Sequence, residues 1–276
     1  SLVEKTLGMT DLPLLSEPNL QQQLVEIGYQ GKKLEELEGL SAVEKTNMLF
    51  IVQDPYTSYY DAKVVRDFVA LTQKLGFDPI LLPFKPNGKA MHIKGFLARF
   101  SKTAKTQAEF LNRVAKLNVP LVGVDPAIVL SYRDEYKEAL GDSRGDFHVL
   151  TAHEWLTNQL ESNALQSAVK NIAKSDHTFE WHLFPHCTES TFMPNSPKEW
   201  QHIFAQFGQT LNVEKVGCCG MAGVFGHEVQ NQTMSKDIYD VSWGKKLQGK
   251  DPNHCLATGY SCRSQVKRYE KAILKH

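Results

Sequence analysis

Two spacings of apolar residues alternate along most of the chain. Short apolar runs suited to buried strands, such as residues 48–53 and 79–84, are followed by longer segments in which apolar residues recur every three or four positions. In residues 61–75, for example, Val64 and Phe68 fall on one helical face. Strands that alternate with helices are typical of a parallel sheet covered by helices, so the predicted fold class is α/β.

The order of these elements occurs twice. The first copy is expected to hold strands 48–53, 79–84 and 120–124 with helices 61–75 and 88–117, and the second to hold strands 180–185, 213–217 and 255–258 with helices 197–207 and 226–247 and a closing helix. We interpret this order as an internal repeat of two pseudo-symmetric halves, each a small parallel sheet flanked by helices.

Three pairs of landmarks support the repeat. Asp54 matches Cys187, Gly88 matches Gly220, and Ile128 matches Cys262, at offsets of 133, 132 and 134 residues. We therefore expect three parts: a connecting segment at residues 1–46 with a short helix near residues 19–27, a first copy at residues 47–152, and a second copy at residues 153–276. A helical linker at residues 153–173 is expected between the copies.

The composition limits the partners and the location. The chain has 276 residues, 42% of them hydrophobic, with 31 basic and 31 acidic side chains. Without net charge, no field would draw it to nucleic acid or to an anionic membrane surface. Its apolar stretches are far shorter than the roughly 20 residues that span a bilayer, so we expect a cytoplasmic protein, with peripheral attachment to the inner membrane left open. Because the chain begins at Ser1, we expect it to be part of a longer polypeptide.

All five cysteines lie after residue 186. Cys187 is separated by 30 residues from the adjacent pair Cys218 and Cys219, and Cys262 follows Cys219 after 42 more. Each of these four cysteines follows a predicted strand, and the loops after parallel strands share one edge of the sheet. We therefore predict that the four thiols converge into one metal site. Cys255, at the start of a predicted strand, is expected to be a core or spare thiol.

Four thiols at one sheet edge suit two kinds of metal. They meet the ligand demand of a 4Fe-4S cluster, and the neighbouring Gly217 and Gly220 would let backbone amides approach the cluster sulfurs. Tetrahedral zinc accepts the same ligands. Free cysteine is also a common buried apolar residue, but adjacent cysteines flanked by glycines favour a metal site. Without a Cys-x-x-Cys pair, a dithiol enzyme is less favoured.

The segment that carries these cysteines resembles a known family. Cys187, the run Cys218-Cys219-Gly220-Met221-Ala222-Gly223, and Cys262 are similar to the cysteine-rich CCG domain. That domain occurs in tandem in heterodisulfide reductase, in anaerobic glycerol-3-phosphate dehydrogenase and in the iron-sulfur proteins of lactate oxidation. The resemblance covers residues 47–276. It extends to the first copy, where Asp54, Pro86, Asn87 and Ile128 replace the cysteine ligands, so that no cluster can be held there through thiolates.

The resemblance also implies a function. The family's fuller pattern ends in Cys-x-x-Cys, where this chain has Gly259 and Cys262, which implies four ligands and an ordinary cubane cluster. Residues 184–189 and 217–223 are most similar to the carboxy-terminal part of flavin-dependent D-2-hydroxyacid dehydrogenases. That similarity implies an FAD domain elsewhere in the polypeptide and oxidation of a D-2-hydroxy acid, with 2-hydroxyglutarate favoured, to its 2-oxo acid.

The resemblance further implies that electrons pass from the flavin through the cluster to an external acceptor such as a quinone, an electron-transfer protein or a flavoprotein. A structural zinc module and a metal-free interaction domain are the alternatives. His182, His186, His227 and His254 lie near the cysteines in the sequence and are expected to be supporting or surface residues rather than ligands. The sequence assigns no catalytic residue, because it has no recognisable Ser-His-Asp arrangement, phosphate-binding glycine loop or pair of catalytic carboxylates.

Overall fold

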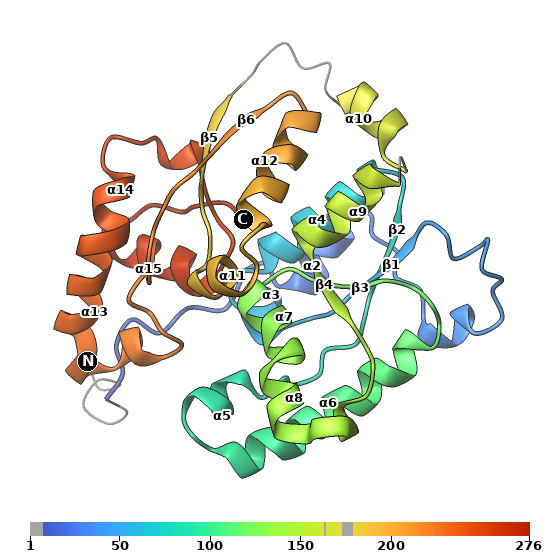
Figure 1. Cartoon of the computed structure of the whole chain (residues 1–276), viewed down its shortest axis with the longest axis horizontal. Coiled ribbons are helices and arrows are strands. Elements are labelled where there is room, and N and C mark those ends of the chain that lie inside the picture. Colours follow the sequence, from blue (N-terminus) through green and yellow to red (C-terminus); the bar gives the residue numbers. More distant parts are fainter. Residues whose placement is uncertain (1–7, 163, 173–178) are drawn as a thin grey trace. The chain divides into compact units, whose positions relative to one another are not determined.

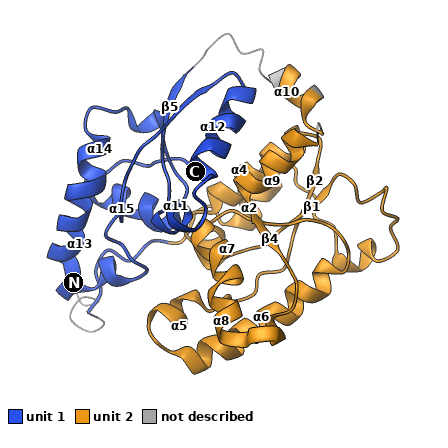
Figure 2. Cartoon of the chain, in the orientation of Figure 1, with its two compact units in different colours: residues 1–14, 175–276 blue, residues 15–174 orange. Residues whose placement is uncertain are grey.

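The computed structural model describes residues 8–162, 164–172 and 179–276 (Figure 1). The chain divides into unit 1, residues 1–14 and 175–276, and unit 2, residues 15–174 (Figure 2). Each unit is built on a small parallel sheet flanked by helices, which confirms the predicted α/β class. Residues 1–7 of the predicted connecting segment and residues 163 and 173–178 of the predicted second copy lie outside the described residues, and residues 163 and 173 also belong to the predicted linker.

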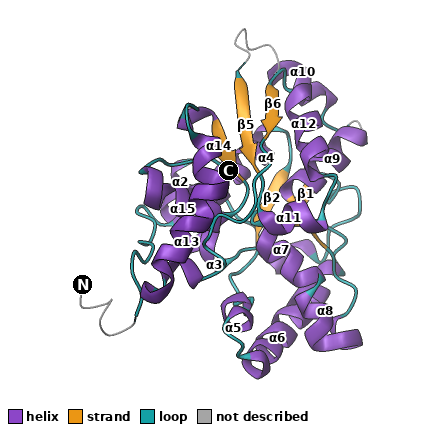
Figure 3. Cartoon of the chain, turned by 60° about the vertical axis from the view of Figure 1, so that its left-hand side comes forward, coloured by secondary structure: helices purple, strands orange, loops and turns teal. Residues whose placement is uncertain are grey.

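Unit 2 contains a parallel sheet with the strand order β2-β1-β3-β4. Figure 3 shows its strands β1 and β2 among the helices. Its strands are β1 (Met48–Ile51), β2 (Asp78–Leu81), β3 (Leu121–Gly123) and β4 (Val149–Thr151). Its helices are α2 (Leu20–Glu26), α3 (Pro55–Tyr59), α4 (Ala62–Lys74), α5 (Lys89–Ile93), α6 (Leu97–Ala115), α7 (Pro126–Arg133), α8 (Glu135–Leu140), α9 (Ala152–Glu161) and α10 (Gln166–Ile172), with 3-10 turns at Leu34–Leu37 and Gly141–Arg144. Asp-Pro pairs begin α3 and α7, because an aspartate accepts from the first free amides and proline suits the first helical position.

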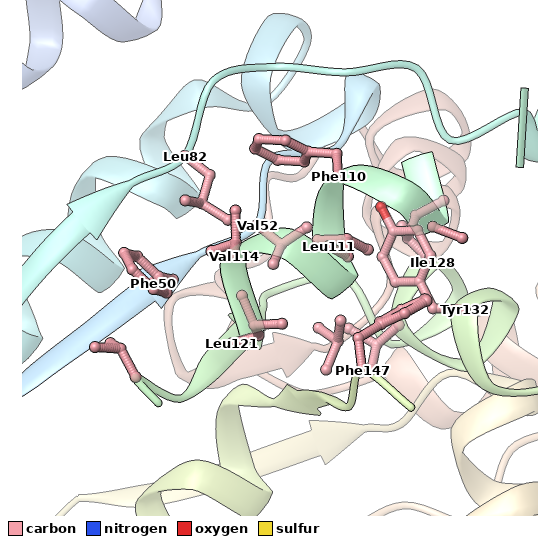
Figure 4. Packing of buried hydrophobic residues seen from close by; sticks show 14 of the residues in the cluster. Phe50, Val52, Leu82, Phe110, Leu111, Val114, Leu121, Ile128, Tyr132 and Phe147 are labelled. Atoms are coloured by element: carbon pink, nitrogen blue, oxygen red, sulfur yellow. The ribbon is translucent and has the colours of Figure 1, made fainter. Parts of the chain in front are cut away.

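Apolar side chains fill the space between the unit 2 sheet and helix α6 (Figure 4). Phe50 and Leu121 are paired on neighbouring strands and belong to the same cluster as Leu111 of α6. Trp155 of α9 makes an edge-on contact with Phe68 of α4, with ring centroids 6.0 Å apart. Large buried side chains therefore anchor the helices of unit 2 to its sheet and to one another.

Unit 1 contains a parallel sheet with the strand order β6-β5-β7. Its strands are β5 (Glu180–Phe184), β6 (Thr210–Val213) and β7 (Cys255–Ala257), and its helices are α11 (Cys187–Phe192), α12 (Ser196–Gln206), α13 (Gln232–Tyr239), α14 (Lys245–Leu247) and α15 (Tyr260–Glu270). A π-helical turn, Asp240–Gly244, joins α13 to α14, and 3-10 turns lie at Phe225–His227, Val229–Asn231 and Pro252–His254.

Helices cover both faces of the unit 1 sheet. Leu183 packs in a cluster with Trp200 and Phe204 of α12. Its neighbour Phe184 belongs to a different cluster and lies against Trp243, with ring centroids 5.2 Å apart. Successive strand residues point to opposite faces, so unit 1 has the three-layer arrangement of a small α/β unit.

The two sheets share a strand order and a register. Met48 pairs with Asp78 in unit 2, and Glu180 pairs with Thr210 in unit 1, each 132 residues further along the chain. The third strands correspond as well, since β3 pairs with β1 as β7 pairs with β5. The order β2-β1-β3 in unit 2 is therefore repeated as β6-β5-β7 in unit 1.

Helix starts refine the alignment of the two units. Asp54 and His186 are both the N-cap of the helix that follows the first strand, so the observed register aligns Asp54 with His186, one residue from its predicted partner Cys187. Ile128 and Cys262 are each the third residue of their helix, as the predicted offset requires.

Several elements differ from the predicted ones, and for three of them the physical reason is clear. Strand β6 begins three residues before the predicted segment 213–217 and overlaps it only at Val213, because it is an edge strand in which Leu211 is the one buried residue and the apolar pattern is weak. The predicted helix 88–117 is broken between α5 and α6, where Gly95 adopts a φ of 75°. Strand β4 is an addition to the predicted elements, because three residues carry too little pattern to be recognised.

Helix α6 is an amphipathic helix of 19 residues. Leu111 and Val114 lie on its buried face, whereas Leu97 is 59% exposed. No helix in the described ranges combines the length and the apolar character that crossing a membrane requires.

We predict that Leu111→Ala lowers the free energy of unfolding by about 2–5 kcal/mol, because it empties a closely packed part of the unit 2 core. Urea unfolding measures this change. Leu97→Ala in the same helix is the matched control and should change the free energy by less than about 0.5 kcal/mol. Equal effects of the two substitutions would contradict the packing described for α6.

Candidate metal centre

Three loops at the carboxyl edge of the unit 1 sheet carry the predicted ligands. Cys187 is the first residue of α11 and follows β5, and Cys262 lies in the first turn of α15 after β7 (Figure 1). Cys218 and Cys219 lie in the loop after β6. Because the three strands are parallel, their following loops leave from the same edge of the sheet.

The four thiols lie in contact in a series. Cys218 is hydrogen-bonded to both Cys187 and Cys219, and Cys219 is hydrogen-bonded to Cys262. In the part of the chain that the structure describes, no three His, Cys, Asp or Glu side chains form a ready-made ligand set around a single ion. The cysteines predicted to meet are therefore in contact, and the metal itself stays a prediction.

The thiols differ in how readily they ionise. Hydrogen bonds from the Cys187 and Cys219 thiols lower the pKa of Cys218 well below its usual range, and the Gly220 amide acts in the same direction. The pKa values of Cys187 and Cys219 are raised, chiefly because each gives a hydrogen bond to Cys218. Negative charge therefore gathers first on Cys218, and a metal that binds all four sulfurs as thiolates would displace the remaining protons.

Backbone amides approach two of the sulfurs. The Gly220 amide donates to the Cys218 Sγ at 3.3 Å, and the Met221 amide donates to the Cys219 thiol. Gly220 has a φ of 83°, and a Cβ there would lie 2.2 Å from the Ser235 carbonyl oxygen, so this position requires glycine. The expectation for Gly217 is wrong, because its amide donates to the Ser242 hydroxyl at 2.7 Å instead.

Exposure differs across the four thiols. Cys219 and Cys262 are 3% and 1% exposed and belong to the apolar cluster that contains Trp243. Cys187 and Cys218 are half-buried. A group bound to these sulfurs would therefore have an apolar side and a side open to solvent or to a partner.

A buried hydrogen-bond network that sequence reasoning did not identify lies beside the thiols. Glu189 of α11 is fully buried and accepts hydrogen bonds from the hydroxyls of Ser196 and Thr258 and from Trp200 Nε1 at 3.1 Å. The Thr258 hydroxyl oxygen in turn accepts the His186 amide at 2.9 Å. The network ties α11, which begins with Cys187, to the end of β7. Glu189 lies in the polar run Cys-Thr-Glu-Ser, and nothing in this run indicates that its side chain is buried. The network could therefore not be predicted from the sequence.

The remaining candidates lie apart from the thiol series. Cys255 is fully buried in β7, and burial raises its pKa to about 11, with further effects from Lys250, Asp251 and Glu214 rather than from the other thiols. Three of the four candidate histidines have other partners: His182 contacts Glu214, His227 contacts the Thr10 carbonyl, and His254 contacts Asp251. Of the four histidines, His186 is the one that the structure brings to the thiols.

The corresponding edge of unit 2 has different chemistry. Gly88 and Gly220 occupy matching positions in the two units, with φ angles of 80° and 83°. Asn87, which precedes Gly88, therefore corresponds to Cys219. Asp54 is 2% exposed and accepts hydrogen bonds from the two free amides at the start of α3. This edge therefore offers carboxylate and amide groups where unit 1 has thiols.

Two buried carboxylates interact at that edge. Burial, followed by the nearby carboxylate of Asp125, raises the pKa of Asp54 to about 6, although hydrogen bonds from Thr57 and Tyr56 oppose the shift. Asp54 is therefore partly protonated near neutral pH in the folded chain.

The fold and the site define a class: an α/β protein of two related units, one of which carries neighbouring thiols at the carboxyl edge of its sheet.

The amino-acid sequence is similar to those of known proteins. The chain is 82% identical over 276 residues to the D-2-hydroxyglutarate dehydrogenase of Haemophilus influenzae and covers 27% of it. It is 56% identical over 275 residues to the D-2-hydroxyglutarate dehydrogenase of Escherichia coli, and 38% identical over 275 residues to that of Pseudomonas putida, covering 26% of each. No protein-family model matches the chain.

The chain thus spans about a quarter of the length of these relatives, in their carboxy-terminal part. The similarity extends over 100% of the chain in each of the three comparisons. Both units are therefore shared with these proteins.

We predict that Asp54→Asn removes a pH-dependent part of the stability. Because the pKa of Asp54 is about 6 in the folded chain and about 4 in an unfolded one, the folded state holds the proton more tightly. The stabilising contribution is complete below pH 4 and is lost as the pH rises through about 6. The loss is on the order of 3 kcal/mol for a shift of about two pKa units.

Urea unfolding between pH 4 and pH 7 tests this prediction. Across that window the free energy of unfolding of the wild type should fall relative to that of Asp54→Asn, in which the amide oxygen still caps α3. Asp67→Asn is the control, because the Asp67 side chain is 54% exposed, and it should keep the wild-type pH dependence. Parallel curves for the wild type and Asp54→Asn would contradict the prediction.

Proposed function

We propose that the chain is the iron-sulfur part of a D-2-hydroxyglutarate dehydrogenase and that its unit 1 is a CCG domain. In this proposal the thiols of Cys187, Cys218, Cys219 and Cys262 hold one 4Fe-4S cluster. The cluster lies between a flavin, bound as FAD elsewhere in the polypeptide, and an external electron acceptor. The overall reaction oxidises D-2-hydroxyglutarate to 2-oxoglutarate.

The contact of four thiols from three separate loops is the observation that carries the proposal. A single buried cysteine can serve as apolar filling, whereas a 4Fe-4S cluster takes four cysteine thiolates. The donor set therefore fits the cluster in number and in chemistry. The names of the relatives support the choice of substrate.

The residues around the thiols have separable tasks. A 4Fe-4S cluster bound by these sulfurs would accept and donate single electrons. The Gly220 and Met221 amides stabilise negative charge on the sulfurs of Cys218 and Cys219. Trp243 and the other apolar residues of the same cluster exclude water from the side of Cys219 and Cys262. The half-buried side, at Cys187 and Cys218, is where a partner could approach closely enough for electron transfer.

A structural zinc ion is the second candidate, because zinc accepts the same four thiolates in a tetrahedral site. Zinc has no redox chemistry, so a zinc site could not pass electrons from the flavin to the acceptor. Metal analysis separates the two candidates directly.

We predict that the chain, purified without oxygen or reconstituted with iron and sulfide, contains about four iron and four sulfide atoms per chain, as a 4Fe-4S cluster requires. Replacing Cys187, Cys218, Cys219 or Cys262 by serine should lower the iron content several-fold, because each removes a thiolate ligand. Iron and acid-labile sulfide assays and visible absorption measure the outcome.

Cys255→Ser is the matched control for the iron assay, because Cys255 is buried in the same unit but lies outside the thiol series. It should keep the wild-type iron content per folded chain, with circular dichroism reporting the fold. A colourless wild-type protein with one zinc per chain would overturn the redox proposal.

We predict that D-2-hydroxyglutarate, added without oxygen to the natural full-length protein that carries this chain, bleaches the visible absorption and produces an electron paramagnetic resonance signal of a reduced cluster. The L enantiomer is the control and should produce neither change. In a Cys218→Ser variant, flavin absorption should still bleach while the cluster signal is lost. Identical signals from the wild type and this variant would show that the thiols do not hold the electron acceptor.

A further inference from the structure

His186 connects the two helices that begin beside Cys187 and Cys262. It is the N-cap of α11, where its Nδ1 accepts the Thr188 amide at 3.2 Å. Its Nε2 lies 3.3 Å from the hydroxyl of Ser261, the residue before Cys262 in α15. The side chain is 7% exposed, so both ring nitrogens are held within the fold.

Gly259 allows this placement of the ring. A Cβ at Gly259 would lie 2.3 Å from His186 Cδ2 and 3.0 Å from its Cγ, both well inside van der Waals contact. The φ of Gly259 is −90°, a conformation open to any residue, so the backbone itself does not require glycine here. The imidazole therefore occupies the volume that a side chain at position 259 would take.

The hydrogen bonds fix the tautomer of His186. Because Nδ1 accepts a backbone N–H, its lone pair is used and the proton of the neutral ring lies on Nε2. A nitrogen that carries a proton has no lone pair to offer a metal. This tautomer excludes Nε2 as a metal ligand and makes it a hydrogen-bond donor to the Ser261 hydroxyl, next to Cys262 in the chain.

We propose that His186 is a positioning residue of the cluster site, whose imidazole, seated over Gly259, holds the starts of α11 and α15 together and places an N–H donor at the Ser261 hydroxyl, beside the sulfurs. This inference rests on the proposed function for the cluster. It predicts two separable effects of replacing His186: a faster loss of iron from the site and a change in the midpoint potential of the cluster. A donor dipole beside the sulfurs stabilises the more negative, reduced state.

The test uses His186→Asn, because the Asn side chain still caps α11 but is too short to reach Ser261. In the natural full-length protein, His186→Asn should lose iron in air about tenfold to a hundredfold faster than the wild type. Its midpoint potential, followed by electron paramagnetic resonance, should be more negative. His202→Asn, at an exposed histidine of α12, is the control and should match the wild type in both measurements.

A second measurement tests the packing without any metal. In the metal-free chain, Gly259→Ala should lower the melting temperature in the wild-type background and have less than half that effect in His186→Ala, because the ring is then absent. Equal effects in both backgrounds would overturn the packing on which the inference depends.

The outcomes separate the inference from the function on which it rests. If the wild type holds no iron-sulfur cluster, the proposed function fails, whatever the melting temperatures show. If the wild type holds the cluster but His186→Asn matches His202→Asn in iron loss and in potential, the positioning role of His186 is wrong and the proposed function stands.

Discussion

Parallel pairing of β5 with β6 and β7 is the constraint on which the candidate site depends. Cys187 and Cys262 are far apart in the sequence and come together because the loops after parallel strands leave from one edge. Backbone hydrogen bonds of the sheet therefore set the spacing of the loops, and side chains such as His186 and Glu189 adjust it. A site built in this way can take ligands from distant parts of the chain, which explains the long gaps on both sides of the Cys218-Cys219 pair.

Unit 2 shows that the scaffold does not need the thiols. It has the same strand order through β2-β1-β3, and its carboxyl edge is completed by Asp54 and Asp125, which cap helices, and by Ile128 in the core. An edge of this kind can therefore be closed by caps and apolar packing alone. Closing such an edge therefore does not by itself call for thiols, which favours a chemical role for those of unit 1. Asp54 and Asp125 also carry a cost, since two buried carboxylates repel one another.

Much of the site could be predicted because its signals are local. Cys187, Cys218 and Cys262 each follow a predicted strand, so their spacing alone indicated that they would meet. The supporting contacts were beyond the sequence, since the link from Glu189 to Thr258 joins residues 69 positions apart and neither has a distinctive neighbourhood. Gly217 was misassigned for a related reason: a glycine beside a cysteine indicates close backbone approach but not the group it approaches, which here is Ser242. Edge strand β6 was displaced because its polar residues weaken the strand pattern.

The burial of the thiols determines what the surrounding chain must supply. A cluster held by four thiolates is negative, and placing charge beside the apolar residues around Cys219 and Cys262 is unfavourable unless dipoles or cations offset it. Unit 1 provides amide dipoles at Gly220 and Met221, and Arg263, 5% exposed, follows Cys262 directly and donates to the carbonyls of β7 and the loop beyond it. The Met221 amide and Arg263 serve the buried side, at Cys219 and Cys262, where water cannot screen charge, whereas the Gly220 amide serves Cys218. On the side of Cys187 and Cys218, solvent can do so, and less compensation by the protein is needed.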